Sequence, residues 1–149
     1  MLQVPVVGII QKGDDGDDEV KIWEAYQAMF APSPYDPQEA LVNARTVLPK
    51  ELHEDQYYLP LALIFSNVPA LFDCWPRYFK PGNVNIPGLK KNIFGYLSSG
   101  ELFIATLALH LFNDCNRLPK DGLLGLRNLD SYHYELAIHA IQIFTKGVR

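Results

Sequence analysis

Apolar residues are concentrated in two stretches of the chain, residues 59–65 (LPLALIF) and residues 102–112 (LFIATLALHLF). A helix that is apolar on nearly all of its sides lies buried inside a domain. We therefore expect these stretches to form the two central helices of the fold. Pro60 stands inside the first stretch. Because its ring blocks a backbone hydrogen bond, we expect it to kink the segment or to separate two helices.

Amphipathic helices are predicted on either side of this apolar centre. Apolar positions recur with the helical period in residues 18–31, 37–48 and 131–144, and a shorter helix is predicted at residues 68–79. One face of the second helix carries Leu41, Ala44, Arg45 and Leu48. One face of the last helix carries His133, Ala137, Ala140, Ile141 and Phe144. We expect these faces to pack against the central helices.

Capping patterns mark the ends of several predicted helices. Asp36 precedes a proline and is followed by an acidic residue three positions later, which is typical of a helix start. Ser98 and Glu101 have the spacing of a capping box, in which each side chain accepts a hydrogen bond from the backbone of the other residue. Asp130 is placed to cap the last helix, and Gly147 to end it.

The adjacent serines Ser98 and Ser99 are also candidates for a nucleophile. A serine nucleophile needs a base and a group that orients the base. Neither the GxSxG nor the SxxK motif is present, because the residues three positions after these serines are Glu101 and Leu102. We therefore interpret Ser98 as a helix cap rather than as a catalytic group.

Other segments are predicted to lie outside the long helices. Residues 3–11 are rich in valine and isoleucine, which favours a strand. Residues 12–19 (KGDDGDDE) predict an acidic turn, and their glycine and acid positions depart from those of a calcium-binding EF-hand loop. Residues 80–92 (KPGNVNIPGLKKN) contain two prolines and two glycines and predict the longest loop. Residues 119–124 predict a short helical turn.

Together these elements predict a mainly α fold, namely a compact bundle of about six helices with a short N-terminal β strand or hairpin. A chain of 149 residues is long enough to bury a core as a single domain, residues 1–149. Residues 1–17 would form an appended strand and acidic turn.

The composition and the net charge argue against some classes of partner. The formal net charge is −4, and there is no basic stripe that would bind nucleic acid. The longest apolar run, residues 57–72, is interrupted by prolines and polar residues, whereas a spanning helix needs about 20 mostly apolar residues. The first residues lack the basic segment of a signal peptide. We interpret Cys74 and Cys115 as reduced thiols, so we expect a cytoplasmic protein. The charge and the interrupted apolar run lead us to expect neither a nucleic-acid nor a membrane partner.

Metal-binding motifs are absent from the sequence. None of the four histidines has the HExxH spacing, and there is no CxxC pair. We therefore expect no cofactor and no catalytic residue. The alternative is a metal-dependent or other enzyme that uses His110, Cys115 and either His133 or His139. Packing of the last two long helices against each other would bring these residues together.

One short cluster has the composition of a protein-binding surface. Apolar and basic residues alternate in CWPRYFKPG, at Trp75, Arg77, Tyr78 and Lys80. Tryptophan, tyrosine and arginine dominate binding hot spots, so these four residues are our candidate partner-binding site. The alternative is a core helix whose basic side chains extend from the core to solvent.

Several stretches between residues 55 and 146 resemble one protein family. They are YYLPLALIFSN, LFDCWPRYF, NVNIPGLKKN, SSGELFIATLALHLFND and NLDSYHYELAIHAIQIF. They are similar to a small, uncharacterised bacterial and phage-associated family of all-helical proteins, a domain family of unknown function. Asn113 and Asp114 stand where that family has an Asn-Gly-like pair. The resemblance implies a helical fold and assigns no catalytic residue.

These observations favour a small cytoplasmic protein-interaction or regulatory protein without catalytic activity, whose partner is another protein. The resemblance adds the hypothesis of an inhibitor of a host system that is encoded by a phage or another mobile element. Besides the enzyme alternative, the chain could be a self-associating structural protein. Residues 3–10 (QVPVVGII) would then pair as an exposed edge strand, and a homodimer would be the expected assembly.

Overall fold

The computed structural model describes residues 21–23, 34–113, 116–119 and 122–148. The chain divides into two units, Met1–Ser33 and Pro34–Arg149. In the first unit residues 21–23 are helical, which agrees with the helix expected there. The predicted N-terminal strand, the acidic turn and the rest of that helix lie outside the described residues. All the other described residues belong to the second unit.

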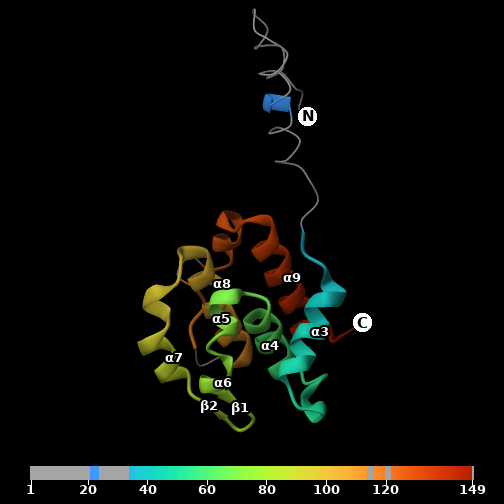
Figure 1. Ribbon diagram of the computed structural model, residues 1–149, viewed down its shortest axis with the longest axis vertical. Coiled ribbons are helices and arrows are strands. Elements are labelled where there is room, and N and C mark those ends of the chain that lie inside the picture. Colours follow the sequence, from blue (N-terminus) through green and yellow to red (C-terminus); the bar gives the residue numbers. More distant parts are fainter. Residues whose placement is uncertain (1–20, 24–33, 114–115, 120–121, 149) are drawn as a thin grey trace, which may run out of the picture. The chain divides into compact units, whose positions relative to one another are not determined.

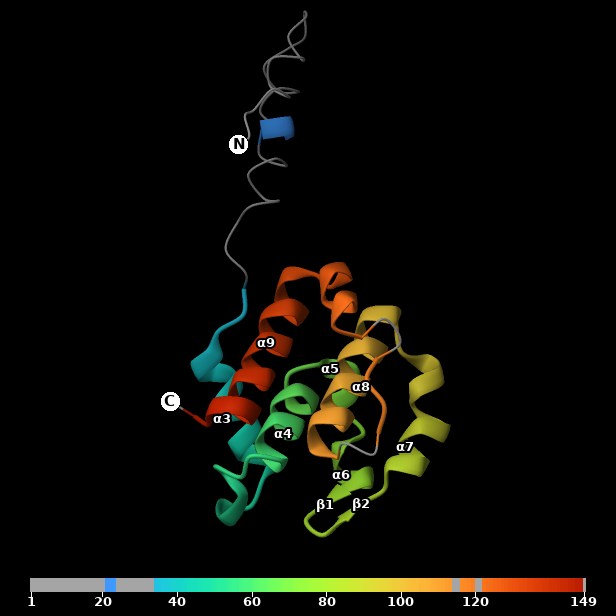
Figure 2. The same cartoon turned by 180° about the vertical axis from the view of Figure 1, so that it is seen from behind.

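The centre of this unit is α4 (Tyr58–Ser66), which packs against α3 (Pro37–Val47), α8 (Ser99–Phe112) and α9 (Ser131–Lys146). Figures 1 and 2 show α4 between α3 on one side and α8 on the other. The side chains of Leu59 and of residues 61–65 are inaccessible to solvent, because α4 is apolar on every side. On α8 the central leucines and alanines are likewise buried. The mainly α fold and its two central helices are therefore confirmed.

Shorter elements complete the unit. They are η1 (Lys50–Leu52), α5 (Pro69–Phe72), α6 (Trp75–Tyr78), β1 (Phe79–Lys80), β2 (Asn83–Val84), α7 (Ile86–Asn92), η2 (Phe94–Tyr96) and η3 (Gly122–Asn128), where η denotes a 3₁₀ helix. The two strands form an antiparallel hairpin that pairs Phe79 with Val84 and turns at Gly82, whose φ is 78°. None of the described helices is long and apolar enough to cross a lipid bilayer.

The capping box predicted at the start of α8 is confirmed. The Ser98 hydroxyl accepts a hydrogen bond from the Glu101 backbone N–H at 3.1 Å. The Glu101 carboxylate accepts one from the Ser98 backbone N–H at 2.9 Å. Two N–H groups at the start of the helix, which the helix itself leaves unpaired, are thus satisfied. The Ser98 side chain acts as a cap, as the sequence predicts.

The caps of α3 and α9 are confirmed as well. The Asp36 carboxylate accepts hydrogen bonds from the first backbone N–H groups of α3. The Asp130 carboxylate accepts one from the His133 N–H at 2.8 Å. Gly147 ends α9 with a φ of 82°, a left-handed conformation that glycine adopts without steric cost.

Predictions that depended on proline were wrong in three places. Pro60 neither kinks nor divides α4, because it lies in the first turn, where a helix leaves the backbone N–H unpaired. For the same reason Pro69 and Pro76 begin α5 and α6, so residues 68–79 form two short helices rather than one. Residues 80–92 form the hairpin and α7 rather than a long loop. Pro87 lies in the first turn of α7, and the Asn85 side chain accepts a hydrogen bond from the Gly88 N–H at 3.0 Å.

The buried face of α9 differs in part from the predicted one. Ala137 and Ala140 are buried as expected, and they are accompanied by Leu136 and Ile143, which the prediction omitted. Ile141 and Phe144 are only partly buried. Because apolar residues occupy more than half of the circumference of this helix, periodicity alone did not identify the face that meets α4.

A buried asparagine connects α3, α4 and α9. The Asn67 side-chain amide donates hydrogen bonds to the backbone carbonyls of Ala40 at 3.1 Å and Leu63 at 2.8 Å. The Asn67 backbone carbonyl accepts a hydrogen bond from the Tyr132 hydroxyl at 2.9 Å. A buried polar side chain needs such partners, and these partners fix the packing of three helices at one point.

Candidate functional site

The aromatic residues of the predicted partner-binding cluster belong to the core. The side chains of Trp75 and Tyr78 are only 7% and 8% exposed, and the Trp75 ring stacks on Phe79 with a centroid distance of 4.4 Å. Arg77 and Lys80 are exposed. The sequence pattern was therefore that of core residues alternating with solvent-exposed charges. Because neighbouring core residues cover most of the two aromatic rings, Trp75 and Tyr78 offer little surface to a partner in this conformation, and partner binding by this cluster stays a prediction.

The histidines do not converge on one point. The Nδ1 atom of His110 lies 2.7 Å from the Asn116 carbonyl oxygen, and that of His139 lies 2.6 Å from the Tyr35 hydroxyl. The Nδ1 atom of His133 lies 3.0 Å from the Asp130 carboxylate. The part of the chain that the structure describes holds no group of three side chains placed to bind a metal. Cys115, the remaining member of the alternative metal site, lies outside the described residues.

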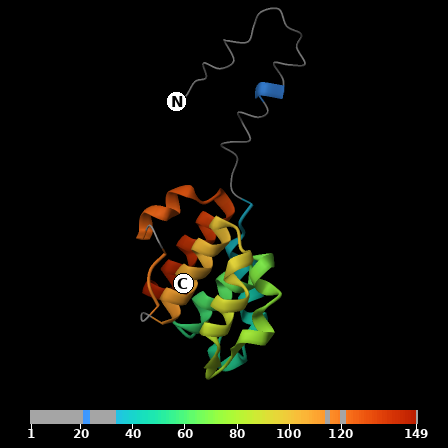
Figure 3. The same ribbon diagram turned by 90° about the vertical axis from the view of Figure 1, so that its left-hand side faces the viewer.

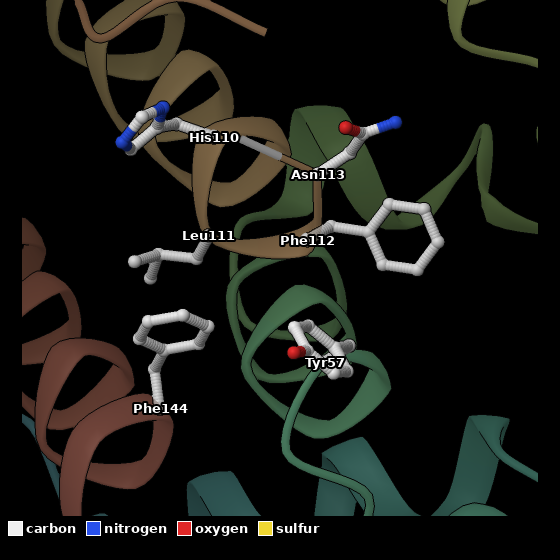
Figure 4. A pocket seen from close by; sticks show the side chains of 6 residues that line it. All are labelled: Tyr57, His110, Leu111, Phe112, Asn113 and Phe144. Atoms are coloured by element: carbon white, nitrogen blue, oxygen red, sulfur yellow. The ribbon is translucent and has the colours of Figure 1, made fainter. Parts of the chain in front are cut away.

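A first hollow lies where the end of α8 meets the start of α4 and the end of α9. Its volume is about 510 Å³. Figure 4 shows the Leu111 and Phe144 side chains turned toward each other, while Phe112 points to the opposite side of the α8 end. Tyr57 meets Phe144 edge to face, with 6.0 Å between the ring centroids. His110 is the one imidazole among the lining residues, which are otherwise aromatic, aliphatic or amide side chains.

A second and larger hollow runs between α3 and α9. Its volume is about 710 Å³, and we call it the α3–α9 groove. One face of each helix lines it, together with Tyr35 before α3 and the backbone that follows α9. The lining residues are Tyr35, Pro37, Gln38, Leu41, Arg45, Glu135, Ile138, His139, Gln142, Ile143, Lys146, Gly147 and Val148. A cavity of this size is within the range that holds small organic ligands.

Tyr35 and His139 form a half-buried polar pair in the wall of the α3–α9 groove. Besides their 2.6 Å contact, the two rings meet edge to face at 5.8 Å. Burial raises the pKa of the Tyr35 hydroxyl, and the nearby charges of Tyr132, Asp36 and Glu135 raise it further. Burial also lowers the pKa of His139. Both shifts favour the neutral forms of the two side chains, in which the Tyr35 hydroxyl and the His139 ring can share a hydrogen bond at one end of the groove.

Exposed apolar side chains occur in η2, in the first turn of α8 and in η3. Figures 1, 2 and 3 all show these three elements at the same end. The exposed fractions are 89% for Tyr96, 59% for Leu123 and 67% for Leu124. Leu102, in the first turn of α8, is also exposed. We call Tyr96, Leu102, Leu123 and Leu124 the η3 surface.

Close glycine contacts hold η3 against α8. A Cβ atom added to Gly125 would stand 2.1 Å from Cε2 of the Phe103 ring, so only glycine lets the backbone of η3 approach so closely. One turn earlier on α8, a Cβ on Gly100 would stand 3.7 Å from the Leu129 side chain. The leucines of η3 are therefore displayed on a segment that is packed down against the helix next to it.

Basic residues flank the η3 surface. Arg127 is exposed on η3 itself, and Lys91 is exposed in the last turn of α7, which packs against η2. Within the described residues the one ion pair joins His133 to Asp130, so neither of these cations is paired with a carboxylate. Exposed apolar side chains therefore occur together with an exposed arginine on η3.

Sequence reasoning missed both the η3 surface and the α3–α9 groove. Residues 119–124 were interpreted as a helical turn, although two adjacent leucines between two glycines gave a signal. Arg45 was placed correctly on the Leu41 face of α3, but the sequence gave no indication that Lys146 would lie along the same groove. Comparison of the chain with protein-family models, with curated protein sequences and with solved structures gave no match.

Proposed function

We propose that this protein is a non-catalytic interaction protein that binds another protein through the η3 surface. The observation that carries the proposal is the exposure of Leu123 and Leu124 on a segment whose Gly125 closely approaches the Phe103 ring of α8. Large exposed apolar patches on folded domains mark interaction sites.

The charges around the η3 surface indicate the chemistry of the partner. Arg127 and Lys91 favour a protein segment that presents apolar side chains flanked by aspartate or glutamate. This partner replaces the one inferred for the Trp75 cluster, whose aromatic rings are buried. The proposal includes a cytoplasmic location, which the buried free thiol of Cys74 supports. Regulation of a host system remains a prediction from the family resemblance.

The test of this proposal is site-specific photocrosslinking in cells. A benzoyl-phenylalanine at position 124 is expected to capture one acidic-apolar partner, and the same group at position 42 is expected not to. Val42 is a matched control because it is 62% exposed on α3. A Leu123→Asp, Leu124→Asp double variant, checked for native circular dichroism, should no longer compete with the unmodified protein for that partner. Equal capture at both positions would contradict the proposal, and capture of a second copy would favour self-association.

A further inference from the structure

Charge is distributed unevenly along the α3–α9 groove. Figures 1 and 2 show α3 and α9 running in the same direction, from the upper to the lower part of the unit. Arg45 and Lys146 lie in the last turns of the two helices, so both cations are toward the same end of the groove. Glu135 lies eleven residues before Lys146, which is about 16 Å along a helix axis.

The opposite end of the groove is acidic. Glu135 and Asp36 both act on the Tyr35 hydroxyl, so these carboxylates lie at the end that Tyr35 and His139 form. The two ends are thus chemically different. The charged side chains that line the groove are Arg45, Lys146 and Glu135, which give one net positive charge at neutral pH.

Among the described residues, neither Arg45 nor Lys146 has a carboxylate partner. The described residues contain a single ion pair, and it involves neither Arg45 nor Lys146. The Arg45 Nε donates a long hydrogen bond of 3.5 Å to the His53 carbonyl oxygen. This contact leaves the remaining guanidinium N–H groups available to an anion, and a guanidinium binds a carboxylate through two parallel hydrogen bonds.

The middle of the groove is apolar. Leu41 of α3 and Ile138 and Ile143 of α9 line it between the two charged ends. Glutamine amides stand on each helix, Gln38 near the acidic end and Gln142 one turn before Lys146. This arrangement suits a ligand with a compact apolar body and one negative charge at one end, because apolar walls with a few fixed polar groups set both affinity and orientation.

We propose that the α3–α9 groove binds a small amphipathic carboxylate, whose carboxyl group lies between Arg45 and Lys146 and whose apolar body packs mainly on Ile138, over the almost fully buried Leu41 and Ile143. A carboxylate suits the cationic end because the Arg45 guanidinium can bind it through two parallel hydrogen bonds. The site is separate from the η3 surface, so the two proposals stand or fall independently.

The test is an NMR titration of the full-length ¹⁵N-labelled protein with 4-phenylbutyrate as the probe. The neutral amide 4-phenylbutanamide is the matched control ligand, because it has the same apolar body without the charge. We expect the acid to shift amide signals of α3 and α9 and to bind at least about tenfold more tightly than the amide, a difference of about 1.4 kcal/mol. Equal affinities, shifts confined to other elements, or no shift up to the solubility limit would overturn the proposal.

Charge-matched variants separate a specific site from general attraction. Arg45→Gln with Lys146→Gln should weaken binding of the acid at least tenfold and leave binding of the amide unchanged. Lys80→Gln with Lys91→Gln removes the same charge from exposed positions that do not line the groove, and it should bind the acid as the native protein does. An equal loss in both double variants would overturn the proposal. If Arg45→Gln does not fold, Lys146→Gln alone decides, since that side chain is exposed.

Discussion

Two leucine-containing segments of this protein differ in burial. In α4 the sequence YLPLALIFS places every residue from 59 to 65 in the core. In η3 the sequence GLLGLRN leaves Leu123 and Leu124 mostly exposed. η3 also contains two glycines, an arginine and an asparagine, whereas α4 is apolar along almost its whole length. The two segments differ in their neighbours as well, because α4 contacts α3, α8 and α9 and is covered by them, whereas η3 contacts α8 and α9 and leaves Leu123 and Leu124 in solvent.

The comparison shows that burial depends on the contacts an element receives from the rest of the fold. An apolar helix surrounded by others loses its water-accessible surface on all sides and contributes stability. An apolar segment that is packed on one side contributes less stability and keeps a surface that a partner can cover. Stability and binding should therefore respond to substitution in the two segments in opposite ways.

The largest expected effect tests this contrast directly. Leu63→Ala should lower the free energy of unfolding by about 3–5 kcal/mol, because it leaves a cavity at a fully enclosed position. Leu124→Ala, the matched substitution in η3, should change it by less than about 0.5 kcal/mol. Urea denaturation followed by circular dichroism measures both values. Similar losses from the two substitutions would mean that η3 is covered by part of the core.

The second prediction concerns the contact that holds η3 in place. Gly125→Ala should destabilise the protein by about 1–3 kcal/mol, because the new methyl group would overlap the Phe103 ring. Gly100→Ala is the control, since its Cβ would make an ordinary contact of 3.7 Å with Leu129 and should stabilise α8 by up to about 1 kcal/mol. Thermal unfolding of both variants gives the comparison. A Gly125→Ala variant as stable as the native protein would show that Phe103 moves aside freely.

Local sequence signals predicted part of the fold because they depend on few residues. The caps at Asp36, Ser98 and Asp130 were found from spacing alone, since a cap needs only its own first turn. The central position of α4 and α8 followed from apolar residues on every side of each helix. Pro60 was misinterpreted and the helix start at Pro76 was overlooked, because a proline that ends one helix and a proline that begins another look alike in sequence.

Features that depend on tertiary contacts could not be predicted in this way. Trp75 and Tyr78 were interpreted as binding residues because they alternate with basic residues. This pattern occurs in binding hot spots, and it also occurs where core residues lie next to exposed basic side chains. Tyr35 and His139 are more than a hundred positions apart in the sequence, so no local sequence pattern predicts their contact. The α3–α9 groove combines side chains from both ends of the unit, so its charge pattern is visible only after folding.

A smaller effect is expected at the capping box of α8, which stands at the boundary between the core and the η3 surface. Ser98→Ala should cost about 1 kcal/mol of stability, because the Glu101 N–H loses its acceptor. Ser99→Ala is the control, since Ser99 is the first helical residue and alanine has the higher helix propensity. Chemical denaturation distinguishes the two. Equal stabilities would show that water replaces the serine hydroxyl without loss.

The smallest expected effect is the change in stability with pH that is caused by His139, a half-buried polar side chain. Burial lowers the pKa of His139 below its ordinary value of 6.5, so the unfolded chain takes up a proton more readily than the folded protein does. Its contribution to stability is therefore present in full above pH 6.5 and declines as the pH falls toward the lower, folded pKa. Because the His139 side chain is only partly buried, the change should be small.

This pH dependence can be isolated with the variant His139→Gln, which cannot titrate. Urea unfolding between about pH 5 and 7.5 should show the native protein losing stability toward acid more steeply than this variant. Gln142→Ala, which alters the same groove without changing a titratable group, should keep the native slope. If all three slopes coincide, His139 is as accessible to protons in the folded protein as in the unfolded chain. The Tyr35 end of the α3–α9 groove would then be open to water, like the η3 surface and unlike α4.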